Sequence, residues 1–334
     1  MGAIPDKGAF FSVRTPAWWD TAREYVLAEY PGKEKAMELA DQNWDVAQRG
    51  VAIERRNADG VLCWQRVEGY VEHFRSDNGV TLRIGSDTFQ RIPNRVPWEF
   101  CELLIEQGFL YETAGCMDEG RQCFLTLLLN EPITIKGDDS VTLPYVGASW
   151  AHDGSMSFSV RSTSVRQVCE NTVSASEAEG KKLGTNFVFR HTKNVLERVA
   201  EAKKVIKGVR ENHDVYVQAM NELAEIHVTP AQRDMFVSTI IGDKGGVVSM
   251  SATVSDRVKD NLEAERAKIN ACFFGPTIPE AHKLTGYGLH LAGVEYADHL
   301  RGYRSKDSYV RRTLLTDSPF KANLNRTIRE IVAA

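Results

Sequence analysis

The stretch SWAHDGSMSFSVRS (residues 149–162) decides the fold predicted for this chain, because an Asp-Gly pair separates two β-type runs. Asp153-Gly154 favours the left-handed backbone of a tight hairpin turn. The flanking runs SWAH and SMSFSV are suited to its two strands. We therefore expect a β-hairpin here, and a hairpin joins antiparallel strands.

The same pattern extends upstream to about residue 49. Short β-type runs are separated there by further turn pairs, namely Asp59-Gly60, Asn78-Gly79 and Gly137-Asp138. One segment, WEFCELLIEQGF (98–109), interrupts these runs and predicts a helix that ends at Gly108.

Helical spacing dominates on both sides of this β-rich region. TPAWWDTAREYVLAEY (15–30) and KEKAMELADQNWDVAQ (33–48) predict helices near the N-terminus. TSVRQVCENTVSAS (163–176) predicts a return to helix after the hairpin. HTKNVLERVAEAKKVIKGVR (191–210) has apolar residues at an unbroken 4-3-4-3 spacing, which predicts a helix that packs along one face. Further helices are expected after Thr229-Pro230, after Ser255, over GLHLAGVEYADHLR (288–301) and in the last 15 or so residues.

These patterns predict an α+β protein. Its mainly antiparallel sheet would contain β-hairpins and packed helices, and a helical C-terminal region would follow. We expect three parts: an N-terminal helical segment (1–48), an α+β core (49–210) and a helical C-terminal region (211–334).

The composition is that of an ordinary folded protein, with 43% hydrophobic and 26% charged residues in 334. No apolar run approaches the roughly 18 residues that a membrane span needs. The start, MGAIPDKGAFF, lacks the features of a signal peptide. The six cysteines form no CxxC pair and are expected to be reduced and buried. We therefore expect a cytoplasmic protein without membrane contact.

Signature motifs of common enzymes and cofactor sites are missing. The sequence contains no GxxxxGK[ST], GxGxxG, HExxH or GxSxG, and no His/Cys pairs at metal-ligand spacing. Three clusters could still carry chemistry: a general base at His152-Asp153, a thiolate–imidazole pair of Cys169 and His191, and a cation site at Asp138-Asp139. Each has a structural alternative that its context favours, respectively a turn, a buried thiol and a solvated turn. We expect no cofactor and no catalytic centre.

Charge is strongly segregated along the chain, although the formal net charge is only −4. Residues 1–180 carry 17 basic and 27 acidic side chains. Residues 181–210 carry nine basic against two acidic side chains, and residues 301–329 carry eight against two. Cations at helical spacing can follow a phosphate backbone, whereas the alternative is a solvated lysine face. The candidate nucleic-acid-binding residues are Arg161, Arg166, Arg190, His191, Lys193, Lys203, Lys204 and Lys207.

Several stretches resemble the phage/plasmid-like protein family, a domain of unknown function found in phages, plasmids and bacterial genomes. They are QNWDV (42–46), LYETAGCMDEGRQCFLTL (110–127), HDGSMSFSVRSTSVRQVCENT (152–172), RHTKNVLERVAEAK (190–203) and AGVEYADHLRGYR (292–304). The resemblance implies a protein of a mobile element. The order of hairpin, strand and helix over 143–175 is compatible, by analogy alone, with the Rad52-like core of single-strand annealing proteins.

Three functions remain open at this point, of which an enzyme that uses His152, Asp153 or Cys169 is the least favoured. The first is an oligomeric protein that binds single-stranded DNA and anneals or protects it, without catalysis. The second is a phage module that binds a host enzyme or defence component through the acidic N-terminal half.

Overall fold

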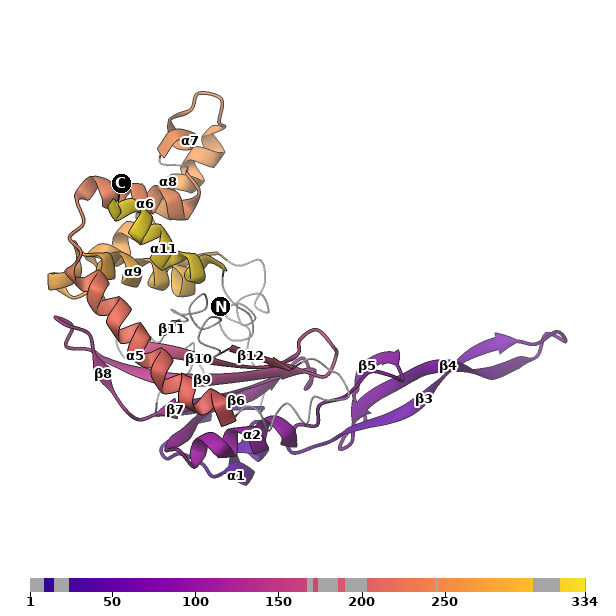
Figure 1. Ribbon diagram of the computed structural model, residues 1–334. Helices are drawn as coiled ribbons and strands as arrows, with labels where there is room; N and C mark the ends of the chain where they lie inside the picture. Colours follow the sequence, from indigo (N-terminus) through magenta and orange to yellow (C-terminus); the bar gives the residue numbers. More distant parts are fainter. Residues whose placement is uncertain are drawn as a thin grey trace. The chain divides into compact units, whose positions relative to one another are not determined.

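The computed structural model describes residues 9–14, 24–166, 171–173, 186–189, 203–243, 246–302 and 319–333. The chain forms two compact units, each made of discontinuous segments. The first unit contains residues 1–128, 146–161 and 186–207, and the second contains 129–145, 162–185 and 208–334. Helices and mainly antiparallel strands make this an α+β protein, as predicted, whereas the predicted three-part division stays a prediction (Figure 1).

The larger sheet has the strand order β11-β10-β9-β7-β6-β1-β2, with β12 also on β10 and β8 also on β9. Its strands are β1 (Phe10–Val13), β2 (Val26–Leu27), β6 (Phe109–Met117), β7 (Gln122–Leu129), β8 (Ile133–Thr134), β9 (Val141–Ala151), β10 (Phe158–Arg166), β11 (Asn171–Val173) and β12 (Asn186–Phe189). The neighbours β9 and β10 form the hairpin predicted from residues 149–162. Gly154 has a φ of 80° in its turn, and the Ser155 amide donates to Asp153 Oδ1 at 2.8 Å.

A second sheet has the order β3-β4-β5, from β3 (Val46–Arg56), β4 (Leu62–Arg75) and β5 (Thr81–Ser86). The predicted turn pairs join these strands, and Gly60 and Gly79 both have positive φ. β4 pairs with β5 only from Tyr70 onward, so beyond that residue β3 and β4 continue as a two-stranded ribbon (Figure 1).

Among the described residues, the helices α1 (Lys33–Leu39) and α2 (Arg95–Ile105) lie wholly in the first unit. α2 is the helix predicted between the β-type runs, and Gly108 follows it with a φ of 91°. Its buried side chains include Trp98, Phe100 and Leu104, which are at most 1% exposed. Burying three such side chains contributes several kcal/mol to folding.

The C-terminal half of the chain is helical, as predicted. Its helices are α5 (Lys203–Glu225), α6 (Pro230–Ile241), α7 (Val247–Met250), α8 (Asp256–Phe274), a 3₁₀ turn (Glu280–His282), α9 (Gly286–Glu295), a π-helical turn (Tyr296–Leu300) and α11 (Pro319–Ala333). Thr229 begins α6 with a capping box, in which its side chain accepts from the Gln232 amide.

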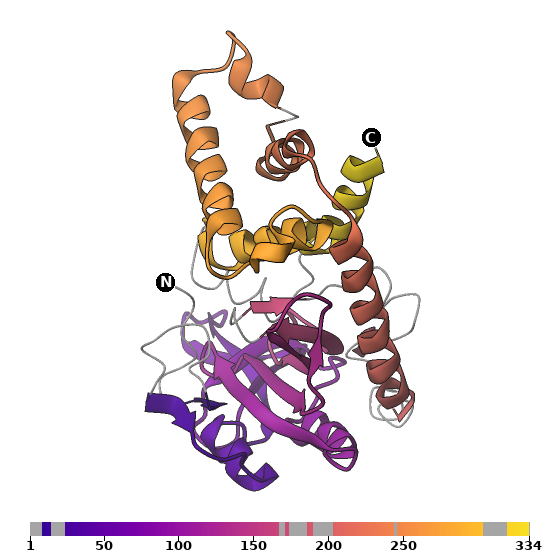
Figure 2. The same cartoon turned by 90° about the vertical axis from the view of Figure 1, so that its left-hand side faces the viewer.

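α9 is the central helix of the second unit, where α8 and α11 pack against it (Figure 2). Every residue from Gly286 to Val294 is buried, so this helix is covered on all sides. Glycines allow the neighbouring segments to pack this closely against α9. A Cβ on Gly288 would lie 1.9 Å from the His282 carbonyl oxygen, and a Cβ on Gly293 would lie 2.7 Å from Leu324 Cδ1.

Three predictions of helix were wrong. Residues 1–48 include β1, α1 ends at Leu39, and β3 begins at Val46. The helix ends there because Asp41 takes a φ of 51° and the Gln42 side chain bonds to carbonyls of β6 and β7. Residues 163–176 contain the end of β10 and β11 instead of a helix, because antiparallel pairing of Ser164 with Val173 satisfies their backbone. The helix predicted over 15–30 is wrong where it is described, because β2 (Val26–Leu27) pairs there with β1. Residues 15–23, and residues 191–202 of the helix predicted over 191–210, lie outside the described residues.

Candidate nucleic-acid interface

The structure places five of the eight predicted basic and aromatic contact residues on regular elements. Arg161 and Arg166 lie on β10, opposite Asn186 and Asn171. The other three, Lys203, Lys204 and Lys207, lie in the first two turns of α5. Arg166 belongs to the second unit and the other four to the first. Arg190, His191 and Lys193 lie outside the described residues.

α5 carries its charges in two separate blocks. Its first eight residues contain four cations and no carboxylate, and its last fifteen contain four carboxylates and no lysine or arginine. The carboxylate block is partly paired, since Glu225 accepts from Lys136 and Glu222 from Arg329. The beginning of α5 is thus a short, dense run of positive charge.

The predicted general base is in a buried structural position. His152 is 2% exposed, and its Nε2 lies 2.8 Å from Asn94 Oδ1. Because Asn94 Nδ2 donates to the Trp44 carbonyl and Trp150 Nε1 donates to Asn94 Oδ1, that oxygen is an acceptor. His152 therefore carries its proton on Nε2 and donates it. A reactant has no access to this imidazole, and the turn interpretation of His152-Asp153 is the better one.

Of the other two chemical candidates, the structure describes only Asp138-Asp139. Asp138 is 4% exposed rather than solvated, and its Oδ2 accepts from the Tyr287 hydroxyl at 3.1 Å, which links the turn to α9. Cys169 and His191 lie outside the described residues. Among the described residues no three His, Cys, Asp or Glu side chains gather as a metal site would require.

The most exposed feature of the first unit is one that the sequence reasoning missed. From Gln48 to Tyr70, every residue of the β3–β4 ribbon is exposed except Val51 and Val67, which are half-buried. Trp64 is 73% exposed, the largest value for an aromatic side chain in the described part of the chain. The stretch LCWQRVEGY (62–70) is a β-type run, which predicts a strand. No sequence pattern indicates that both faces of this strand are exposed to solvent.

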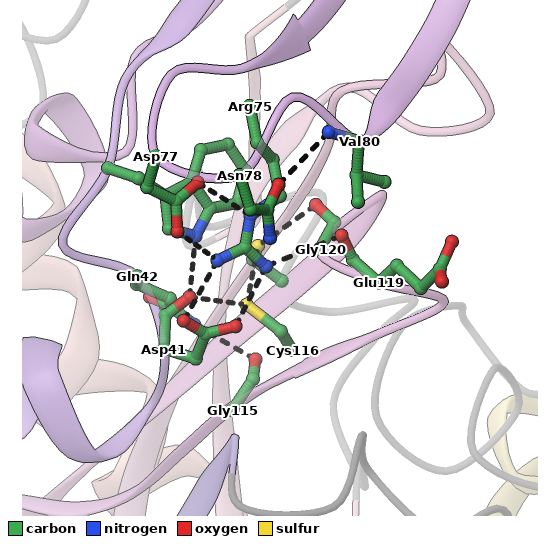
Figure 3. A network of polar contacts seen from close by, with 12 residues as sticks. Asp41, Gln42, Arg75, Asp77, Asn78, Val80, Gly115, Cys116, Glu119 and Gly120 are labelled. Carbon is green, nitrogen blue, oxygen red and sulfur yellow. Dashed lines mark hydrogen bonds and ion pairs between the residues drawn. The ribbon is translucent and has the colours of Figure 1, made fainter.

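Arg75 fixes the root of this ribbon (Figure 3). Its guanidinium is 4% exposed and bonds both carboxylate oxygens of Asp41, at 2.7 and 2.9 Å, and both of Asp77, at 3.0 and 2.7 Å. It also stacks over the Trp44 ring at 4.5 Å. These contacts join the end of β4 to the loop after α1. Gly120 allows them, because a Cβ there would lie 2.7 Å from Trp44.

A second buried network lies beside this root and contains residues of the QNWDV and HDGS stretches. Gln42 donates to the carbonyls of Gly115 and Phe124 and accepts from Trp98 Nε1 at 2.7 Å. The ring centroids of Trp44 and His152 are 5.1 Å apart. These stretches, far apart in sequence, therefore form one rigid polar and aromatic core.

Glu112 makes the stability of the first unit dependent on pH. Burial raises the pKa of this carboxyl to about 7, against a partial opposing effect of Arg14, whose Nη2 is 3.8 Å away. The unfolded chain releases this proton near pH 4.5 and the folded chain near pH 7. The associated stability is therefore complete below pH 4.5 and is lost as the pH rises to 7.

Above pH 7 we expect the free energy of unfolding of Glu112→Gln to exceed that of the wild type by about 3 kcal/mol, and its urea midpoint to be higher accordingly. The two proteins should converge near pH 4.5, where both side chains are neutral. Urea titrations at pH 4.5, 6 and 8 measure this difference. A difference that does not change with pH would contradict the assignment.

The described residues thus define an α+β protein with a rigid first unit, an exposed ribbon and a cationic start to α5. The chain belongs to the family described as "Domain of unknown function (DUF932)", whose model matches residues 81–316. Comparison with curated proteins gave no match. Comparison with solved structures gave none either. Among the described helices, none combines the length and the apolar character that crossing a bilayer demands.

Proposed function

We propose that this is a mobile-element protein that binds single-stranded nucleic acid as an oligomer and anneals or protects it, without a catalytic centre. The observation that carries the proposal is the charge of α5: four cations occupy its first eight residues, and its carboxylates come later. Each phosphate neutralised at such a site releases counterions, which drives binding.

Two further observations support the proposal. The strongest candidate for a catalytic base, His152, is buried and hydrogen-bonded. The sequence also separates an acidic first half from two basic segments, residues 181–210 and 301–329. Such polarity lets one copy meet nucleic acid with one side and a second copy with the other. A Rad52-like core and an origin in a phage or plasmid are parts of the proposal.

Binding of a fluorescein-labelled single-stranded oligonucleotide, followed by anisotropy, tests it. We expect affinity to fall steeply between 50 and 200 mM salt. Lys203→Glu combined with Lys207→Glu should lower the affinity at least about tenfold and reduce the salt slope by about 1.4, since each phosphate contact contributes about 0.7 on single strands.

Arg95→Glu combined with Arg257→Glu is the matched control. It changes the net charge equally, at two exposed positions outside α5. No binding at low salt would overturn the proposal and favour a module that binds a host enzyme or defence component. If both double variants lose affinity for the oligonucleotide equally, α5 is not part of the binding site.

A further inference from the structure

The β3–β4 ribbon is built as a defined structure although it buries almost nothing. Its pairing is continuous from Ala52 opposite Arg66 to Arg56 opposite Leu62. At its tip, Asn57 Oδ1 accepts from the amides of Asp59 and Val61. A two-stranded hairpin with no hydrophobic face is marginal by itself, so its long extension adds little to the stability of the unit. The exposed side chains of the ribbon are therefore available for contacts outside the core.

The two faces of the ribbon differ. Residues directly opposite each other on paired strands share a face. One face therefore carries Trp64 with Arg66 and Leu62 on β4, and Arg56 and Glu54 on β3. Along β4, alternate side chains are about 7 Å apart. Trp64 is thus an exposed aromatic ring that faces Glu54 directly, with Arg66 two residues along its own strand and Arg56 diagonally across on β3.

The other face carries Ile53, Arg55, Cys63 and Gln65. It is less apolar in exposed surface, since Ile53 is 39% exposed against 73% for Trp64. Cys63 is exposed, so the expectation that every cysteine is buried is wrong for this residue, whereas Cys101, Cys116, Cys123 and Cys272 are buried. The two faces can therefore be probed separately, one through an indole and the other through a thiol.

The charge of the ribbon indicates which kind of partner it can bind. The ribbon from Gln48 to Tyr70 contains four arginines, Arg49, Arg55, Arg56 and Arg66, against Glu54, Asp59 and Glu68. Its small positive net charge contrasts with a half of the chain that carries ten more acidic than basic side chains. An aromatic ring between arginines is the arrangement that stacks on an unpaired base and holds the flanking phosphates.

We propose that the β3–β4 ribbon is a nucleic-acid-binding arm, in which Trp64 stacks on an unpaired base and Arg56 and Arg66 bind phosphates. The proposal rests on the function proposed above and adds to it a contact that specifies single strands. Stacking needs an unpaired base, whereas cations alone bind any polyanion. The arm precedes the residues matched by the family model, so it is a feature of this chain's N-terminal part.

Trp64→Ala and Trp64→Phe test the arm, because the side chain is exposed and its loss leaves the core intact. Removal of one stacking ring should lower the affinity for single strands about 5- to 100-fold, whereas phenylalanine, which can still stack, should keep most of it. Ile84→Ala, at a 60% exposed aliphatic residue on β5, is the matched control and should bind as the wild type does.

Tryptophan fluorescence gives a second readout. In a Trp18→Phe/Trp19→Phe background, which removes the two tryptophans outside the described residues, addition of an oligonucleotide should quench the emission. The quenched part should disappear when Trp64→Phe is added, because Trp44, Trp98 and Trp150 are buried. Alkylation of Cys63 should continue at a similar rate in the complex, since it lies on the opposite face. A Cys63→Ser variant identifies its share of the labelling.

The outcomes separate the two proposals. If the wild type binds single strands and Trp64→Ala binds equally well without loss of quenching, the arm is refuted and the function stands. If the wild type fails to bind even at low salt, both are refuted. If Trp64→Ala changes the sedimentation of the free protein but not its affinity for the oligonucleotide, the ribbon is a contact between copies of the chain and the proposed arm is wrong.

Discussion

Replacement of Arg75 by methionine should destabilise the protein by about 2 to 3 kcal/mol, because it removes the hydrogen bonds of a buried guanidinium to two carboxylates that are themselves 41% and 40% exposed. The substitution removes the charge-assisted bonds to Asp41 and Asp77 and the contact with the Trp44 ring. It retains most of the side-chain volume. Urea denaturation measures the loss, and hydrogen exchange should show faster exchange in residues 46–86 than in α9.

Arg49→Met is the matched control. Arg49 also pairs with a carboxylate, Glu72 on the neighbouring strand, but its side chain is 56% exposed. An exposed pair of this kind contributes less than about 1 kcal/mol. Equal destabilisation by the two variants would show that burial of the Arg75 network does not hold the ribbon root. Arg75→Lys should recover only part of the stability, because an ammonium cannot bond two carboxylates with a planar fork.

Replacement of Asn94 by alanine should cost about 3 to 5 kcal/mol. The Asn94 amide is fully buried and makes three bonds, to the Trp44 carbonyl, Trp150 Nε1 and His152 Nε2. Its loss leaves two buried donors and one buried acceptor without this partner, at about 1 to 3 kcal/mol each, partly relieved by relaxation. Thermal and urea unfolding measure the change.

Asn78→Ala provides the comparison for that loss. Asn78 is exposed in the turn after β4, and its Oδ1 accepts one bond, from the Val80 amide. Its removal should cost at most about 1 kcal/mol. If Asn94→Ala were as mild, His152 and Trp150 would have to find other acceptors, and their structural assignment would need revision.

Turn pairs and helix-end signals in the sequence correctly predicted several elements of the fold. Asp59-Gly60, Asn78-Gly79 and Asp153-Gly154 all lie at turns, because glycine accepts the positive φ that a tight turn needs. The helix before Gly108 and the one after Thr229 were equally readable, since a terminating glycine and a capping box act within a few residues.

Long-range contacts overruled local propensity elsewhere. The sequence around Gln42 and Trp44 has helical spacing, but hydrogen bonds to β6, β7 and α2 hold it outside a helix. Residues 164–166 and 171–173 pair with each other in the sheet. The partners of Gln42 lie on elements far along the chain, whereas residues 164–166 and 171–173 are close in sequence and their strand pairing competes with the helix that the spacing predicts.

The candidate interface divides in the same way. The sequence by itself determined the segregation of charge and the run of cations that begins α5, since charge needs no fold to be counted. Only the tertiary structure decided that His152 is buried and that Trp64 is exposed. The exposure of a side chain depends on which other parts of the chain pack against it. Among the described residues, nothing covers either face of the β3–β4 ribbon between Tyr70 and the ribbon tip.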